Sequence, residues 1–170
     1  MKRWRLAFLA LFLFCAGSIA FALYHQLYNW LMPCLLCVYQ RMAIIGIGVV
    51  ALLTAIFPPR SRAGVALSCG AIALLGMTGT VVAVRQVLLQ YGPTDPDALC
   101  ASNLPFPVNF DDPFWPQWVG TLFRPVGDCS AIDFTLFGVT MPAWVALSCI
   151  GIVVFVAVLG AMRWRELVRS

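Results

Sequence analysis

Four long stretches without a charged residue constrain the fold of this chain more than any other feature. They cover residues 6–24, 42–57, 64–84 and 142–162. A membrane-spanning helix needs about 20 apolar residues, and the second stretch reaches that length when it begins near Val38. Continuous runs argue against a membrane barrel, whose strands alternate over about ten residues. We therefore expect an all-α membrane protein, an antiparallel four-helix transmembrane bundle with spans at about 6–24, 38–57, 64–84 and 142–162.

The composition places residues 1–170 in a single integral membrane domain. Hydrophobic residues make up 62% of the chain and charged residues 11%, whereas soluble domains contain about half and about a quarter. The basic start around Lys2 also resembles a signal peptide. Its apolar run of about 19 residues exceeds the 7 to 15 that are typical of that segment, which favours a retained anchor.

The basic residues predict the orientation, because Lys and Arg gather on the cytoplasmic side of membrane spans. Four spans place both termini and the connection 58–63 on one side, and the loops at about 25–37 and 85–141 on the other. The first side carries eight of the 11 basic residues, namely Lys2, Arg3, Arg5, Arg60, Arg62, Arg163, Arg165 and Arg169. We expect a multi-pass protein of the bacterial inner membrane with cytoplasmic termini and periplasmic loops. The net charge of +4 is then a topology signal, and no nucleic acid is expected as a partner.

The long outer loop contains a candidate for a short helix lying in the membrane interface. Its apolar residues recur at helical spacing, at Phe114, Trp115, Trp118, Val119, Leu122 and Phe123. A loop that packs on the helix ends is the alternative interpretation.

The seven cysteines divide by their place in this topology. Three fall inside spans, where a thiol behaves as a small apolar side chain, and four fall on the oxidising outer side, which suggests two pairs. The three are Cys15, Cys69 and Cys149, and the four are Cys34, Cys37, Cys100 and Cys129.

Cys34 and Cys37 form a CxxC motif directly after Pro33, at the start of the second span. The free backbone donors and the positive dipole end of a helix start favour a thiolate there. Residues three and four apart share a helix face, so Cys34, Cys37 and Arg41 form one stripe. A cation so close to the hydrocarbon needs a role, and Arg41 suits two: stabilising the Cys37 thiolate and donating hydrogen bonds to a polar ligand.

Other interpretations of these cysteines are less well supported. Haem attachment needs a histidine after the second cysteine, where this chain has Val38. Zinc sites usually present two close pairs, and Cys100 and Cys129 lie far apart in the sequence, so no metal is expected. A structural disulfide without turnover remains an alternative, although it would have no need of Arg41.

The segment 33–41, PCLLCVYQR, closely resembles the signature of the disulfide bond formation protein B (DsbB) family, membrane oxidases that pass electrons from the periplasmic oxidase DsbA to a quinone. The second cysteine pair in the long loop, the sequence Gly127-Asp128-Cys129 and the sequence MPAW at 141–144 extend the resemblance over nearly the whole chain.

The resemblance implies a role for each site residue. Cys100 would form the mixed disulfide with a DsbA-like thioredoxin-fold oxidase, and Cys129 would resolve it. The electrons would pass to Cys34 and Cys37, with Cys37 and Arg41 facing ubiquinone or menaquinone. Gln86 and Gln90 would line the same pocket. Some relatives have histidine where this chain has Gln86, and glutamine carries no proton at neutral pH, so the route of the proton stays open.

Two further polar residues lie near the outer end of the first span. We expect His25 to be an interface residue and not a catalyst, and Gln26 is a candidate for approaching the quinone pocket. Export of reducing equivalents is disfavoured as a function because it needs a cytoplasmic dithiol, and no cysteine lies in the expected inner segments.

Overall fold

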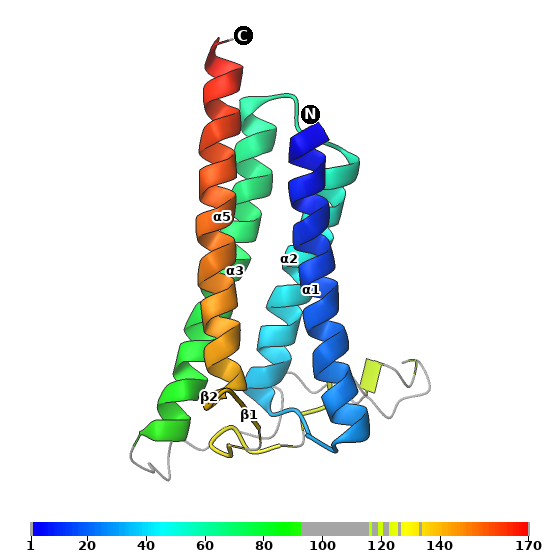
Figure 1. Ribbon diagram of the computed structural model, residues 1–170, viewed down its shortest axis with the longest axis vertical. Helices are drawn as coiled ribbons and strands as arrows, with labels where there is room; N and C mark the ends of the chain where they lie inside the picture. Colours follow the sequence, from blue (N-terminus) through cyan, green and yellow to red (C-terminus); the bar gives the residue numbers. More distant parts are fainter. Residues whose placement is uncertain are drawn as a thin grey trace.

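Four long helices make up the body of the protein in the computed structural model, which describes residues 2–92, 116, 119–120, 123–125, 127–132 and 134–169. They are α1 (Lys2–Tyr28), α2 (Leu35–Ile56), α3 (Arg62–Tyr91) and α5 (Met141–Arg169). The helices run alternately in opposite directions, with both termini at one end of the bundle (Figure 1). All four are long and apolar enough to cross a membrane, which confirms the predicted all-α membrane bundle.

The helices extend beyond the apolar runs that predicted them. Each predicted span lies within one helix, except that Phe57 caps the end of α2. The residues 25–28 and 35–37, which we had placed in the first outer loop, are helical, and α3 continues past Arg85 to Tyr91. The reason is that hydropathy marks where a chain leaves the hydrocarbon, whereas a helix can continue through the headgroup region.

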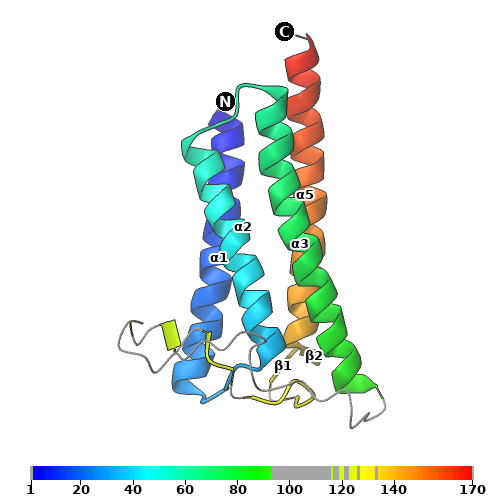
Figure 2. The same ribbon diagram turned by 180° about the vertical axis from the view of Figure 1, so that it is seen from behind.

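Proline and a capping serine separate α2 from α3. Pro58 and Pro59 follow α2 directly, and the Phe57 amide closes the helix by donating to the Leu53 carbonyl at 2.8 Å. Ser61 then caps α3, since its hydroxyl accepts a hydrogen bond from the Gly64 amide at 3.1 Å. These local signals make the connection short and keep the two helices antiparallel neighbours (Figure 2).

Every helix contributes fully buried side chains to the core of the bundle; Phe8, Ile47, Ile72 and Val156, one from each helix, all have 0% exposure. Glycine brings α3 and α5 close together, because a Cβ added at Gly76 would lie 2.7 Å from the Val153 side chain. The outward faces stay apolar and exposed, which requires lipid around them; examples are Leu6, Phe57, Leu67 and Leu88.

The end of the bundle opposite to the termini, called here the loop end, carries the remaining described segments (Figure 1). Strands β1 (Thr135–Leu136) and β2 (Val139–Thr140) form an antiparallel hairpin that leads into α5. Phe137 and Gly138, with φ of 54° and 77°, make its tight turn.

The short helix predicted in the long loop falls largely outside the described residues. Those of its residues that are described, Val119 and Phe123, are helical, as is Gly120. Its place relative to a membrane interface stays a prediction.

Candidate functional site

Cys34 and Cys37 lie at the start of α2, at the loop end. Cys34 is the residue that caps the helix, with extended backbone, and its sulfur accepts a hydrogen bond from the Cys37 amide at 3.2 Å. Both cysteines are free, Cys34 is buried, and Cys37 faces a cavity. Hydrogen bonding with the Cys37 side chain, followed by burial, raises the pKa of the Cys34 thiol, so that Cys34 keeps its proton at neutral pH.

Gln86 of α3 reaches across to both sulfur atoms. Its Nε2 lies 3.2 Å from Cys34 Sγ and 3.3 Å from Cys37 Sγ. The carbonyl oxygen of the same amide accepts a hydrogen bond from Gln40 Nε2 at 2.7 Å. Because Gln40 can only donate through that nitrogen, it fixes the Gln86 amide with its N–H groups towards the cysteines. The buried pair Gln40 and Gln86 therefore presents donors to whichever sulfur carries negative charge.

Arg41 lies one helical turn beyond Cys37, and both line the same cavity. Its guanidinium donates to Gln26 Oε1 of α1 at 2.7 Å. Gln26 thus belongs to the site as a partner that orients Arg41. A cation held in this way can bind an anionic or carbonyl oxygen inside the cavity.

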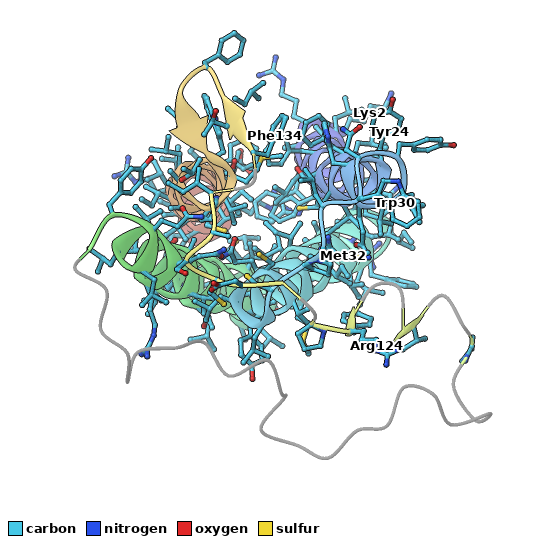
Figure 3. All side chains as sticks on the ribbon, turned by 90° about the horizontal axis from the view of Figure 1, so that it is seen from below. Lys2, Tyr24, Trp30, Met32, Arg124 and Phe134 are labelled. Atoms are coloured by element: carbon cyan, nitrogen blue, oxygen red, sulfur yellow. The ribbon has the colours of Figure 1, made fainter. Side chains whose placement is uncertain are left out.

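The cavity has a volume of about 620 Å³, the size of sites that hold organic ligands. Its polar lining comes from Cys37, Gln40, Arg41, Gln86 and Gln90, together with His25 and two serines. The rest of the lining is mainly apolar and comes from α1, α2, α5 and the segment before α5. Among these residues are Leu13, Phe14, Ile19, Ile44, Phe134 and Val145. Seen from the loop end, Phe134 lies between α1 and α5 (Figure 3).

Gln90 takes a position at the edge of this cavity. Its Nε2 donates to the Ala131 carbonyl at 3.0 Å, which ties α3 to the loop segment. Its Oε1 is buried and finds no hydrogen-bond partner among the described residues. An acceptor in this state suits a ligand that brings its own donor.

The loop segment 127–129 packs directly against the CxxC motif. Gly127 forms a parallel bridge with Cys34, and its amide donates to the Pro33 carbonyl at 3.0 Å. Only glycine fits there, because an added Cβ would lie 2.5 Å from the Met32 carbonyl oxygen. Cys129 follows with 1% exposure, in one buried cluster with Cys34.

Cys129 is disulfide-bonded, whereas the other five described cysteines are free. Cys100, the partner that the resemblance implies, lies outside the described residues. Beside the disulfide, Asp128 accepts hydrogen bonds from the Ser130 amide and hydroxyl, both at 2.9 Å. These bonds lower the pKa of Asp128, which fixes a negatively charged turn at the surface next to Cys129.

The structure thus brings together Cys34, Cys37, Arg41, Gln86 and Gln90, and places Cys129 beside them. Gln40 is not among the site residues predicted from the sequence, and His25, predicted as an interface residue, lines the cavity. A signal for Gln40 was present, since an amide side chain in an otherwise apolar span is costly and usually has a partner. No group of three metal-binding side chains occurs in the part of the chain that the structure describes.

A four-helix membrane bundle with a dithiol at the wall of a cavity, and a disulfide cysteine packed on that dithiol, defines a multi-pass membrane protein of the thiol–disulfide oxidoreductase class. The model of the family described as disulfide bond formation protein DsbB matches residues 4–159. The chain therefore belongs to the DsbB family of membrane proteins for disulfide bond formation.

Curated relatives agree with this assignment. The chain is 38% identical over 147 residues to the disulfide bond formation protein B of Azoarcus sp. (strain BH72), which covers 83% of this chain and 82% of the relative. It is 34% identical over 161 residues to that of Chromobacterium violaceum, at 95% of both chains. It is 33% identical over 170 residues to that of Nitrosomonas europaea, covering 95% of this chain and 94% of the relative.

Proposed function

We propose that this protein reoxidises a periplasmic, thioredoxin-fold dithiol oxidase of the DsbA type and passes the electrons to a membrane quinone, ubiquinone or menaquinone. The cavity is the observation that carries the proposal. It combines a dithiol, a cation and amide donors with a mainly apolar remainder. A quinone has the matching chemistry, because its ring carries two carbonyl acceptors and its tail is a hydrocarbon.

The residues of the cavity fit such a substrate. Arg41, oriented by Gln26, is placed to donate to a carbonyl oxygen, and Gln90 Oε1 is left to accept from a hydroxyl group once the ring is reduced. The apolar lining from α1 and α5, including Leu13, Phe14 and Val145, suits the tail. The quinone would supply an acceptor for two electrons and two protons.

A chain of thiol–disulfide exchanges would bring the electrons to this cavity. The partner's first thiol would attack the disulfide at Cys100, which forms the mixed disulfide and releases Cys129 as a thiolate. The partner's second thiol would then resolve the mixed disulfide and free Cys100, so that both cysteines end as thiols. The resulting dithiol would then reduce a disulfide between Cys34 and Cys37. Each exchange moves two electrons and two protons from one pair to the next, so the number of disulfides stays constant until the quinone accepts the electrons. The buried cluster of Cys34 and Cys129 supports the link between the two pairs.

Redox energetics explain why a non-thiol acceptor is needed. The reduction potential of DsbA is about −120 mV, the most oxidising among common protein dithiols, and about 30 mV corresponds to 1.4 kcal/mol for two electrons. Another ordinary thiol pair would therefore be an unfavourable final acceptor. A quinone dissolved in the bilayer has a more positive potential and reaches a cavity between membrane helices.

The proposed orientation has the termini in the cytoplasm and the loop end in the periplasm of a bacterial inner membrane. The terminal end and the connection after α2 carry most of the basic residues, as the distribution of Lys and Arg in membrane proteins requires. The four cysteines of the relay then lie on the oxidising side.

A coupled assay tests the proposal. Purified protein in detergent is given a reduced DsbA-type protein and a short-chain quinone, and quinone absorbance is followed. We expect turnover with wild-type protein and none with Cys37→Ser. Cys69→Ser, which changes a free thiol in α3 away from the cavity, is the matched control and should turn over like wild type. A wild-type protein that consumes no quinone would refute the proposal.

A further inference from the structure

The cavity contains one side chain whose chemistry the thiol relay does not use. His25, the only histidine of the chain, lies in the last turn of α1 and lines the cavity that also contains Cys37 and Arg41. It is half-buried, so part of the residue stays exposed near the loop end of the bundle.

We propose that His25 donates a proton to the quinone during its reduction in this cavity. The inference rests on the proposed function and names the residue that delivers the proton. It revises the expectation from the sequence that His25 is only an interface residue.

The hydrogen bonds of the imidazole leave one nitrogen available. Asn29 Nδ2 lies 2.7 Å from His25 Nδ1. In the tautomer with the ring proton on Nε2, Nδ1 accepts a hydrogen bond from this amide and Nε2 is the donor. No hydrogen bond to Nε2 occurs within the described residues. If the ring gains a second proton, the Asn29 amide can turn its oxygen towards Nδ1 and still form a hydrogen bond.

Aromatic neighbours hold the ring in place. The Phe134 ring lies 4.7 Å from the imidazole, and the Phe21 ring packs edge-on at 4.4 Å. Phe21 and Phe134 both line the cavity as well. His25 is therefore packed from two sides at the cavity wall, which is the placement that a proton donor needs.

The balance of the reaction calls for this proton. Oxidation of the pair joins Cys34 and Cys37 in a disulfide and releases two electrons. To react as a thiolate, Cys37 first loses its proton to water, so only the Cys34 thiol brings a proton to the cavity. Reduction of a quinone to a quinol takes two electrons and two protons. The second proton leaves the imidazolium of His25, which regains one from the periplasmic water.

Among the described residues that line the cavity, no other group suits this role. The titratable or charged groups that face His25 are Cys37 and Arg41 of α2 and, beside it on α1, Tyr24. Arg41 stays protonated at all physiological pH values, so it cannot deliver a proton. From α3 the cavity receives only Gln86 and Gln90, and from α5 and the described part of the loop it receives no titratable side chain. Histidine is the side chain that exchanges protons near neutral pH.

The test compares two variants that each keep a different property of His25. His25→Gln keeps hydrogen bonding and His25→Phe keeps the ring that packs on Phe21 and Phe134. We expect the rate of quinol formation at pH 7 to fall about 100-fold in both variants, which is the lower end of the range for loss of a general acid. The KM for quinone should stay within about twofold of the wild-type value. Tyr24→Phe, which alters the exposed neighbouring ring outside the cavity, is the control and should match wild type.

Two readouts separate proton delivery from a structural effect. Added imidazole should restore part of the rate of His25→Gln, and the pH dependence that proton donation gives to the wild-type rate should be absent from that variant. Wild-type quinone reduction together with an unchanged rate and pH profile in His25→Gln would overturn the inference. So would a slow variant that imidazole does not rescue and that keeps the wild-type pH profile. A wild type that reduces no quinone would instead refute the proposed function itself.

Discussion

The exchange of Gly127 for alanine should slow the transfer of electrons between the two cysteine pairs. An alanine Cβ would lie 2.5 Å from the Met32 carbonyl oxygen and 3.3 Å from the Cys34 nitrogen. Ordinary contact begins at 3.4 Å, so the segment has to move by about 0.9 Å. Such a shift stretches the hydrogen bond from the Gly127 amide to the Pro33 carbonyl, now 3.0 Å long, beyond useful range.

The loss of this hydrogen bond costs about 1 kcal/mol, which lowers the equilibrium constant for docking of the segment about fivefold. We expect the rate at which Cys34 attacks the disulfide of Cys129 to fall by about the same factor or more. The rate is measured in a Cys37→Ser background, where the cross-linked product accumulates and is identified by proteolysis under non-reducing conditions. Gly70→Ala, at a helical glycine with open space around it, is the matched control and should leave the rate unchanged. An undiminished rate in Gly127→Ala would refute the argument from close packing.

Three further predictions test the cavity and the relay. Arg41→Met should raise the KM for quinone about 10- to 100-fold, because the quinone loses a hydrogen bond from a charged donor. An unchanged KM in steady-state assays would remove Arg41 from the site. Gln86→Leu leaves the buried Gln40 amide without the acceptor that lies 2.7 Å away, and should lower the free energy of unfolding by about 2 kcal/mol. Thermal unfolding should then show a Tm that is several degrees lower. An unchanged Tm would contradict the buried hydrogen bond. Cys100→Ser should block oxidation of the DsbA-type partner while dithiothreitol-driven quinone reduction continues, whereas Cys37→Ser should abolish both; equal activity of the two variants would refute their assigned roles.

The parts of the fold and site that depend on local sequence were predictable. Four charge-free runs indicate four membrane helices because the bilayer sets a minimum apolar length. The spacing of Cys34, Cys37 and Arg41 places them along one side of a helix start, and the structure has Cys37 and Arg41 in one cavity wall. The family resemblance then pointed to Gln86 and Gln90 on another helix, and these also line the cavity.

Contacts between distant segments were not predictable in the same way. The hydrogen bond from Gln40 to Gln86 joins residues 46 positions apart, and the bond from Arg41 to Gln26 joins two different helices. No periodicity or motif marks such pairs, since they depend on how the helices rotate about their axes. The requirement for glycine at position 127 was not predictable either. A side chain is excluded there only because Gly127 packs against Cys34 in the folded protein.

The bridge between Gly127 and Cys34 also determines how the relay responds to protein abundance. Because one chain holds Cys129 and Cys34 in the same buried cluster, the proposed exchange between them would be unimolecular, at an effective local concentration that dilution cannot change. Encounters with the proposed partner and the proposed quinone, in contrast, would slow down as each becomes scarce. A cell that makes few copies of this protein would therefore lose capacity in proportion to copy number, while each copy would transfer electrons between its loops at an undiminished rate.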